Sequence, residues 1–177
     1  MSQYFDLSIR RIEIKKPKRD LKPVIKLQDE VNKTLLHDEY YYPTDERTIQ
    51  ECLDGDYILL GVYNKDKLIA ASFAFEGGLF FSKPITDWME IPGNKIMCHE
   101  LVVVDMEYRG NGIQKSFMDA TIREARQMGY DTIWCCAHPN NTPSVCSIES
   151  TGYKFADQFV VDGWPRNVYY RSTSIQR

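Results

Sequence analysis

The segment "LVVVDMEYRGNGIQKS" (Leu101–Ser116) decides the fold prediction, because three kinds of local sequence follow one another in it. Its apolar beginning is typical of a buried strand. Gly110 and Gly112, one residue apart, predict a tight bend. The residues after the bend repeat apolar side chains at a helical spacing. The segment therefore predicts a strand, a glycine bend and a helix in direct succession.

Such a bend can hold a phosphate group or can be a plain strand-to-helix turn. Two common phosphate motifs fail, because a P-loop and a dinucleotide-binding fingerprint both require glycine where this chain has Lys115. The backbone still directs unpaired N–H groups and the positive end of a helix dipole at one point. We interpret the bend as a phosphate cradle, with the plain turn as the alternative.

The hydrophobic pattern of the remaining chain predicts alternating helices and strands. Helices are expected from Asp20 to Leu35, from Thr44 to Leu53 with Thr44 opening the helix, from Ile113 to Met128, and from about Ser144 to Gly152. Strands are expected over Leu7–Ile14, in a Tyr57–Phe75 hairpin, and over Ile96–Val104, Asp131–Ala137, Tyr153–Asp162 and Arg166–Ser172. This order predicts one α/β domain over residues 1–177, with a mixed sheet flanked by helices.

The composition restricts the possible classes of protein. A hydrophobic fraction of 43% and a charged fraction of 27% are typical of soluble domains, and no apolar run is long enough to span a bilayer. The first residues, "MSQYFDLSIRR", lack a signal-peptide pattern, and the five cysteines contain no CxxC pair. We therefore expect a cytoplasmic protein with reduced thiols and without a membrane partner. A net charge of −3 argues against nucleic-acid binding, and three scattered histidines predict no metal site.

Two segments together resemble one known family. The segment "VVVDMEYRGNGIQ" (Val102–Gln114) closely resembles the acyl-CoA signature of the GNAT superfamily of N-acyltransferases, in which an apolar strand and a turn precede (Gln/Arg)-x-x-Gly-x-(Gly/Ala). The segment "NTPSVCSIESTGY" (Asn141–Tyr153) is similar to the family's Asn-x-x-(Ala/Ser)…Gly-(Phe/Tyr) stretch. The predicted order of elements also fits, and it implies the mostly antiparallel sheet of a GNAT-like fold. Glu107 departs from the usual Gln or Arg at the first signature position.

The resemblance implies an N-acetyltransferase that uses acetyl-CoA as co-substrate and needs no metal. The strand before the bend would then hydrogen-bond the pantetheine arm through Val102, Val103 and Val104. The diphosphate would be held by Arg109, Gly110, Asn111, Gly112, Ile113 and Gln114. Asn141 and Ser144 would complete the coenzyme site. A GNAT-like module that binds acyl-CoA without catalysis is the alternative, and either a monomer or a homodimer is compatible with the sequence.

The chemistry requires a base, because an amine with a pKa of about 10.4 is almost wholly protonated at neutral pH. Glu100, on the strand ahead of the acyl site, is the candidate base, and its alternative role is an edge carboxylate paired with Lys95 or solvent. His99 is expected to be structural. In the family a tyrosine seven residues after the asparagine often serves as general acid, but this chain has Ile148 there. The remaining candidates for the acid are Tyr153, Tyr169, Tyr170 and Cys146, with Tyr153 preferred.

The acceptor side is predicted from charge. Asp29–Asp56 holds nine acidic residues against two basic ones. In the family, the first two helices and their connection form a wall of the acceptor groove. Here that connection, "HDEYYYPTDERT" (His37–Thr48), contains Asp38, Glu39 and Tyr41. Carboxylates would attract a cationic amine and tyrosine rings would cover its methylene stem, so we expect a polycationic small amine or a lysine-type side chain as acceptor. An acidic, solvated loop is the alternative.

Overall fold

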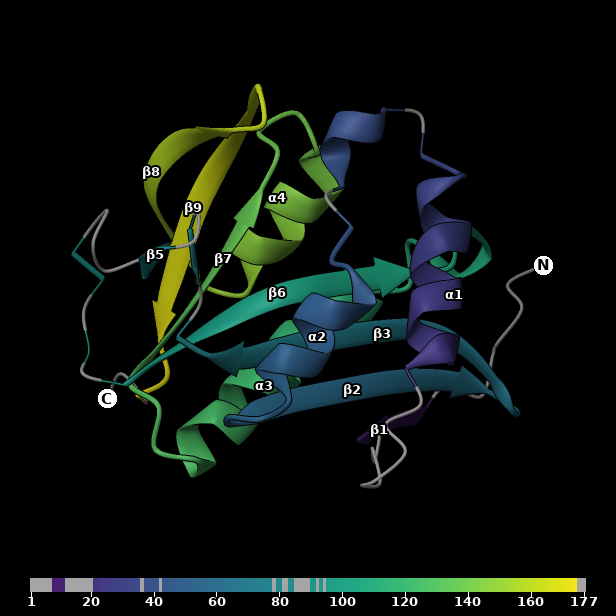
Figure 1. Ribbon diagram of the computed structural model, residues 1–177, viewed down its shortest axis with the longest axis horizontal. Coiled ribbons are helices and arrows are strands. Elements are labelled where there is room, and N and C mark those ends of the chain that lie inside the picture. Colours follow the sequence, from purple (N-terminus) through teal and green to yellow (C-terminus); the bar gives the residue numbers. More distant parts are fainter. Residues whose placement is uncertain are drawn as a thin grey trace.

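The computed structural model describes residues 8–11, 21–35, 37–41, 43–77, 79–80, 83–84, 90–91, 93 and 95–174 (Figure 1). The strands are β1 (Ser8–Arg11), β2 (Tyr57–Asn64), β3 (Lys67–Glu76), β4 (Leu79–Phe80), β5 (Lys83–Pro84), β6 (Ile96–Val104), β7 (Thr132–Ala137), β8 (Lys154–Val161) and β9 (Trp164–Ser172). The helices are α1 (Lys22–Asn32), α2 (Glu46–Cys52), α3 (Ile113–Gln127) and α4 (Thr142–Ser150), and the 3-10 turns are η1 (Asp38–Tyr40) and η3 (Met106–Tyr108). Within the described residues, no helix is long and apolar enough to cross a membrane.

Seven strands form the main sheet, in the order β1-β2-β3-β6-β7-β9-β8. Neighbouring strands are antiparallel except β6 and β7, which run parallel. The short strands β4 and β5 form a separate ribbon in a segment where the sequence predicts no regular structure. The predicted fold class, a mixed and mostly antiparallel sheet with flanking helices, is confirmed.

Helices cover both faces of this sheet (Figure 1). On one face, α1 and α2 bury Val31 and Ile49 against Phe73 of β3. On the opposite face, α3 and α4 contribute Phe117 and Ile148 to a larger apolar core. Burial of these apolar stripes fixes the helices to the sheet, since each buried aliphatic or aromatic side chain contributes about 1.5–3 kcal/mol. The two layers place the ends of α3 and α4 and the α1–α2 connection around the same part of β6.

The first helix differs from its predicted bounds at both ends. It begins at Lys22 with Leu21 at the N-cap position and no side-chain cap, while Pro23 supplies a fixed φ in the first turn. The predicted capping residue, Asp20, lies outside the described residues. The helix ends at Asn32, so Leu35 belongs to the following connection. The apolar period therefore predicts the helix but not its last turn.

The second helix is capped by a different residue from the one predicted. Asp45 is the N-cap of α2, and its carboxylate accepts a hydrogen bond from the Thr48 N–H at 3.0 Å. Thr44 precedes the cap and is buried. Both residues are good caps by type. The Thr44 hydroxyl donates to Glu100 instead, at 3.2 Å, and Asp45 provides the cap.

The two parallel strands, β6 and β7, separate after a short paired region. Pairing joins Ile96–Cys98 to Thr132–Trp134, and the following residues of the two strands have no partners across the gap. On its other edge β6 contains a bulge: Ala74 of β3 pairs with His99 and Phe73 pairs with Leu101, so Glu100 is the additional residue. A bulge bends a strand and re-aims its side chains. The sheet is therefore split at the position where Glu100 projects.

Candidate functional site

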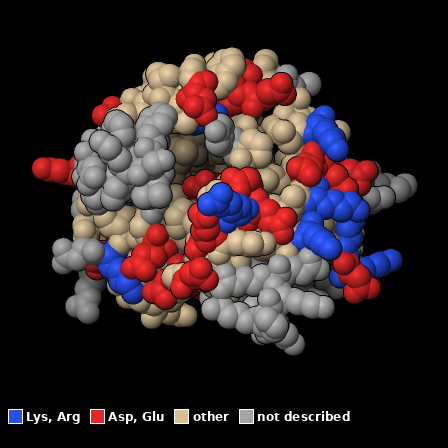
Figure 2. Space-filling model, in the orientation of Figure 1, with Lys and Arg blue, Asp and Glu red and all other residues tan. Residues whose placement is uncertain are grey.

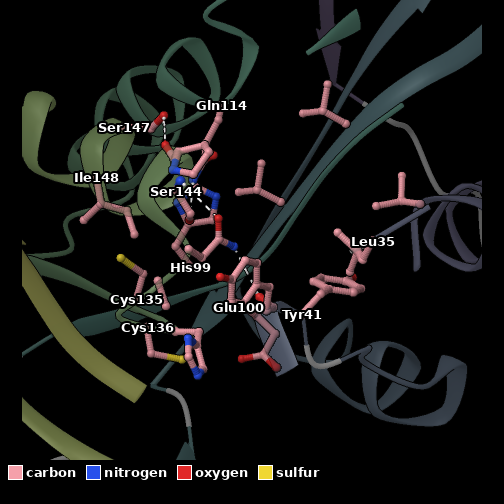
Figure 3. A pocket seen from close by; sticks show the side chains of 18 of the residues that line it. Leu35, Tyr41, His99, Glu100, Gln114, Cys135, Cys136, Ser144, Ser147 and Ile148 are labelled. Atoms are coloured by element: carbon pink, nitrogen blue, oxygen red, sulfur yellow. Dashed lines mark hydrogen bonds between the residues drawn. The ribbon is translucent and has the colours of Figure 1, made fainter. Parts of the chain in front are cut away.

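A cavity of about 1310 Å³ opens where β6 and β7 separate (Figure 3). Its walls come from the α1–α2 connection, β6, the glycine bend with the first turns of α3, the end of β7, α4, and the β8–β9 turn. Pockets for single small ligands commonly measure about 300–1,000 Å³. The cavity is therefore large enough for two substrates to meet in it.

The glycine bend forms one end of this cavity. Gly110 and Gly112 have φ angles of +78° and +71°, a left-handed conformation that glycine adopts without strain. Gly112 is the N-cap of α3 and no side chain caps the helix, so its first N–H groups lack intrahelical partners. A Cβ atom on either glycine would meet no atom within 4 Å. The bend thus offers unpaired donors and open space, which fits a diphosphate.

Most residues predicted for the cradle line the cavity. Asn111 does not: its side-chain amide donates to the Tyr108 carbonyl at 3.0 Å and so stabilises the turn. The Arg109 Nε donates to the Val104 carbonyl at 3.2 Å, which ties this side chain to the end of β6. The residues of the predicted cradle in the cavity wall are Arg109, Gly110, Gly112, Ile113 and Gln114.

The last residues of β6 present a free strand edge to the cavity. Val102 and Val104 line it, whereas the Val103 side chain is 1% exposed and packs under α1 on the other face. Within the described part of the chain, this edge has no strand partner on the β7 side beyond Cys98. An extended ligand can therefore hydrogen-bond to the backbone as an added strand would.

The two sequence motifs meet directly. Asn141 caps α4, and its side-chain oxygen accepts from the Ser144 N–H at 3.4 Å. The Gln114 side-chain amide, from the first turn of α3, donates to the Ser144 hydroxyl at 3.0 Å (Figure 3). Asn141 also donates to the Tyr40 carbonyl at 3.3 Å. Both motifs therefore build one wall of the cavity.

Glu100 is the acidic residue at the split of the sheet. Its Oε1 accepts a hydrogen bond from the Thr44 hydroxyl at 3.2 Å, and its Oε2 accepts from the Cys98 thiol at 3.4 Å. The side chain is reached through the cavity, but the surrounding protein raises its pKa by desolvation, while these two hydrogen bonds lower it. Lys95, the alternative partner, instead pairs with Asp56 at 3.2 Å. Glu100 is thus an exposed, hydrogen-bonded carboxylate that the surrounding protein partly desolvates, which suits a general base.

The candidate acids do not line the cavity. Tyr153 is 4% exposed, and its hydroxyl makes no hydrogen bond within the described part of the chain. Tyr169, Tyr170 and Cys146 are also absent from the cavity wall. Ile148, at the position of the family's usual tyrosine, does line it. The geometry therefore gives no support to Tyr153 as the proton donor.

Restoring a tyrosine tests whether the missing acid limits the reaction. We expect Ile148→Tyr to change the turnover number less than tenfold, because a thiolate leaves readily and water in so large a cavity can deliver the proton. A steady-state rate of thiol release, measured across pH with acetyl-CoA and an amine, checks this. A gain in turnover above tenfold, which corresponds to a barrier lowered by about 1.4 kcal/mol, would show that the wild-type reaction lacks a needed general acid.

The three histidines His37, His99 and His138 also lie in the cavity wall. His99 faces α3, and its Nε2 is 2.7 Å from the Ser72 hydroxyl. Burial lowers the pKa of His99 to about 4, so it is neutral near pH 7, as a structural residue would be. His138 follows β7 and accepts a hydrogen bond from the Asn140 N–H at its Nδ1, 3.2 Å away. Sequence reasoning did not single out His138, since no spacing connects it to either motif.

The structure brings one of the three residues predicted for the acceptor side, Tyr41, into the cavity wall. Tyr41 lines the cavity and its hydroxyl donates to Gln28 at 2.6 Å, whereas Asp38 and Glu39 do not line it. Glu39 instead contacts His37, with 3.4 Å between the carboxylate and Nδ1. These acidic residues belong to a face on which acidic side chains gather over α2 and around η1 (Figure 2). Asp38 and Glu39 therefore lie on the surface outside the cavity wall.

Other charged residues in the wall were not predicted. Glu51 of α2 lines the cavity on the same side as Tyr41, and Asp162 and Arg166 enter from the β8–β9 hairpin. The hairpin is remote in sequence from both motifs, so no local signal marks these residues. No group of three or more potential metal ligands occurs among the residues that the structure describes.

Comparisons with known proteins agree with this geometry. The Acetyltransferase (GNAT) family matches residues 25–153. No curated protein sequence matches the chain significantly.

Solved structures show the same fold at low sequence identity. The ribosomal-protein-S18-alanine N-acetyltransferase of Escherichia coli is 15% identical, with a TM-score of 0.67 over 97% of this chain and 96% of that one. An N-acetyltransferase of Staphylococcus aureus Mu50 is 16% identical, with a TM-score of 0.70 over 96% and 99%. YncA of Salmonella typhimurium, a putative acetyltransferase solved with its cofactor acetyl-CoA, is 16% identical, with a TM-score of 0.63 over 95% and 94%. Because the family match covers most of the sequence and the fold agrees, this chain belongs to the GNAT family of acetyltransferases.

Proposed function

We propose that this protein is an N-acetyltransferase that moves the acetyl group of acetyl-CoA to a primary amine. The observation that carries the proposal is the position of Glu100. It lies on the bulge of β6, between the glycine bend at the start of α3 and the cavity wall formed by the α1–α2 connection. Acetyl-CoA is expected to place its diphosphate at the Gly110–Gln114 bend and its pantetheine arm along Val102–Val104. The thioester would then lie near the bulge, where the sheet is split.

The reaction needs the amine in its neutral form. Deprotonating a lysine-like amine at pH 7.4 costs about 4 kcal/mol, and Glu100 accepts that proton directly or through a water. The amine nitrogen attacks the thioester carbon, a backbone N–H of β6 near Val102 polarises the carbonyl, and the C–S bond breaks. The products are an acetylated amine and coenzyme A, whose sulfur takes up a proton from water or from protonated Glu100.

Release of free thiol tests this function. The protein is mixed with acetyl-CoA and a panel of amines that includes polyamines, a lysine-containing peptide with a blocked N-terminus, a peptide with a free N-terminus and neutral amines. We expect amine-dependent thiol release and a product heavier by one acetyl group. Binding of acetyl-CoA without release for any amine would instead favour a non-catalytic acyl-CoA-binding module.

For the acceptor we propose a cationic amine, either a small polyamine or a lysine-type side chain. Glu51, Tyr40 and Tyr41 line one wall of the cavity. The Glu51 carboxylate, which Arg47 contacts at 2.8 Å, can exchange this exposed partner for a second positive charge of the acceptor, and tyrosine rings contribute about 0.5–2 kcal/mol of cation–π attraction. Arg166 lines the opposite wall. The second charge of the acceptor is therefore expected at the α1–α2 wall.

This acceptor proposal predicts an effect of Glu51 that depends on substrate charge. We expect Glu51→Gln to raise KM severalfold for a diamine and to leave KM for a neutral amine unchanged, with the difference shrinking at high salt. Glu46→Gln is the matched control, because Glu46 lies on the same helix, outside the cavity wall, and accepts from Gln50. Equal KM values for diamine and neutral amine in the wild type would contradict the proposal.

A further inference from the structure

We propose that Gln28 and Thr44 are positioning residues for Glu100. The buried amide of Gln28 on α1 thereby fixes both the α1–α2 connection and the base. The inference rests on the proposed function, in which Glu100 is the base. It assigns a role to two residues outside the family motifs.

Gln28 holds the connection between α1 and α2 by three hydrogen bonds. Its side-chain N–H donates to the Thr44 carbonyl at 2.8 Å, and its oxygen accepts from the Thr44 N–H at 3.1 Å. The same oxygen accepts from the Tyr41 hydroxyl at 2.6 Å. Gln28 is 3% exposed. A buried amide that accepts two hydrogen bonds and donates one in this way fixes a loop in one conformation.

Thr44 carries this fixed position to the base. Its backbone is paired with Gln28, it is 6% exposed, and its hydroxyl donates to Glu100 at 3.2 Å. Asp45 provides the cap of α2, so the hydroxyl of Thr44 is not needed to begin the helix. The side chain is therefore free to orient Glu100. The position of Tyr41, which lines the cavity, is fixed by its hydrogen bond to the same glutamine.

The hydroxyl also affects the protonation of Glu100. A hydrogen bond to the charged form of a carboxylate lowers its pKa, opposite in sign to the desolvation that raises it. Four ionisable groups that interact with Glu100 are neutral near pH 7, since burial raises their pKa values; they are Tyr41, Cys52 of α2, Cys98 of β6 and Cys136 of β7. The charged side chains of Glu51 and Arg166 line the same cavity. Among the described residues, no lysine or arginine forms an ion pair with Glu100. Thr44 and Cys98 are thus its stabilising donors.

The test is the pH dependence of Thr44→Val, which removes the hydroxyl and keeps the shape. We expect the acid limb of kcat/KM to move upward by about one pH unit, so that the rate below the limb falls about tenfold. Thr44→Ser keeps a hydroxyl and should restore the wild-type limb. A lower rate with an unmoved limb, or no effect, would overturn the inference.

A buried threonine elsewhere provides the control. Thr173 is 3% exposed, its hydroxyl donates to the Tyr130 carbonyl, and it is absent from the cavity wall. Thr173→Val should lose stability without moving the limb. Gln28→Met should move the limb in the same direction as Thr44→Val, and the double variant should move it no further than the larger single shift. Additive shifts would show that the two residues act independently.

A measurement without turnover separates the two proposals. Carbon NMR of protein labelled at the glutamate carboxyl carbons gives the pKa of Glu100, identified by the signal that Glu100→Gln removes. An upward shift in Thr44→Val supports the inference even if no amine is acetylated, in which case the proposed function fails alone. An unchanged Glu100 pKa in an active Thr44→Val variant overturns the inference and leaves the function in place.

Discussion

Replacing Gly112 by alanine is expected to weaken the binding of coenzyme A at least 100-fold, or about 2.7 kcal/mol. The added methyl group would enter the open space in front of the bend, where the diphosphate must approach the backbone N–H groups. Its positive φ of +71° also disfavours any L side chain, by about 1–2 kcal/mol, and pushes the bend away from its binding conformation. Calorimetric titration with acetyl-CoA measures the loss.

The opposite end of the same helix supplies a matched control. Gly129 has a φ of +82°, and a Cβ there would also meet no atom within 4 Å. Gly129→Ala should therefore cost a similar amount of stability, measured by thermal unfolding, and retain acetyl-CoA affinity. If both variants bind equally well, or both lose binding in proportion to stability, the bend is not a phosphate cradle.

The fold was largely predictable because its elements depend on local patterns. The apolar spacing of α3, the hairpin of β2 and β3, and the succession of strand, glycine bend and helix are all properties of short segments. The segment around Gly110 and Gly112 and the Asn141–Tyr153 segment together carry the resemblance to the family. That the whole chain forms one domain remains a prediction.

The details of the site were less predictable, because they depend on contacts between distant segments. The bulge at Glu100 results from its pairing with β3, and alternation along β6 alone does not reveal it. Thr44 is a good helix cap by sequence, yet its hydroxyl contacts a residue 56 positions away. No spacing distinguishes Tyr153 from the other candidate acids, and its burial is decided by packing between distant segments.

The acidic residues of the α1–α2 connection and α2 show the same limit of sequence analysis. Composition correctly locates a cluster of carboxylates near the α1–α2 connection, but sequence does not say which of them face inward. Asp38 and Glu39 lie on the short turn η1, whereas Glu51 reaches the cavity wall from α2. A charge count therefore predicts that carboxylates gather near the cavity, but not which of them line its wall.

The catalytic prediction with the largest effect concerns Glu100→Gln. The substitution preserves size and removes the base, so we expect kcat to fall about 10²–10⁴-fold while the affinity for acetyl-CoA is retained. Glu149→Gln, on the exposed face of α4 and outside the cavity wall, serves as the control and should leave kcat unchanged. A loss of less than tenfold in a folded variant would exclude Glu100 as the base.

The pH dependence of this variant gives a second, independent signature. Desolvation raises the pKa of Glu100, so the wild-type rate should fall as the pH decreases through that raised value and the base becomes protonated. The free energy of unfolding should change in the opposite direction. A carboxylate whose pKa is raised by folding binds its proton more tightly in the folded state. Its contribution to stability is therefore lost as the pH rises from the pKa of the unfolded state through the pKa of the folded state. Glu100→Gln cannot ionise and should escape both effects. We therefore expect a variant that is slower than the wild type, no less stable near neutral pH and without the acid limb in its rate. Thermal unfolding and rate measurements over the same pH series test whether both changes arise from one carboxylate, since a base that acts elsewhere would leave the acid limb in place.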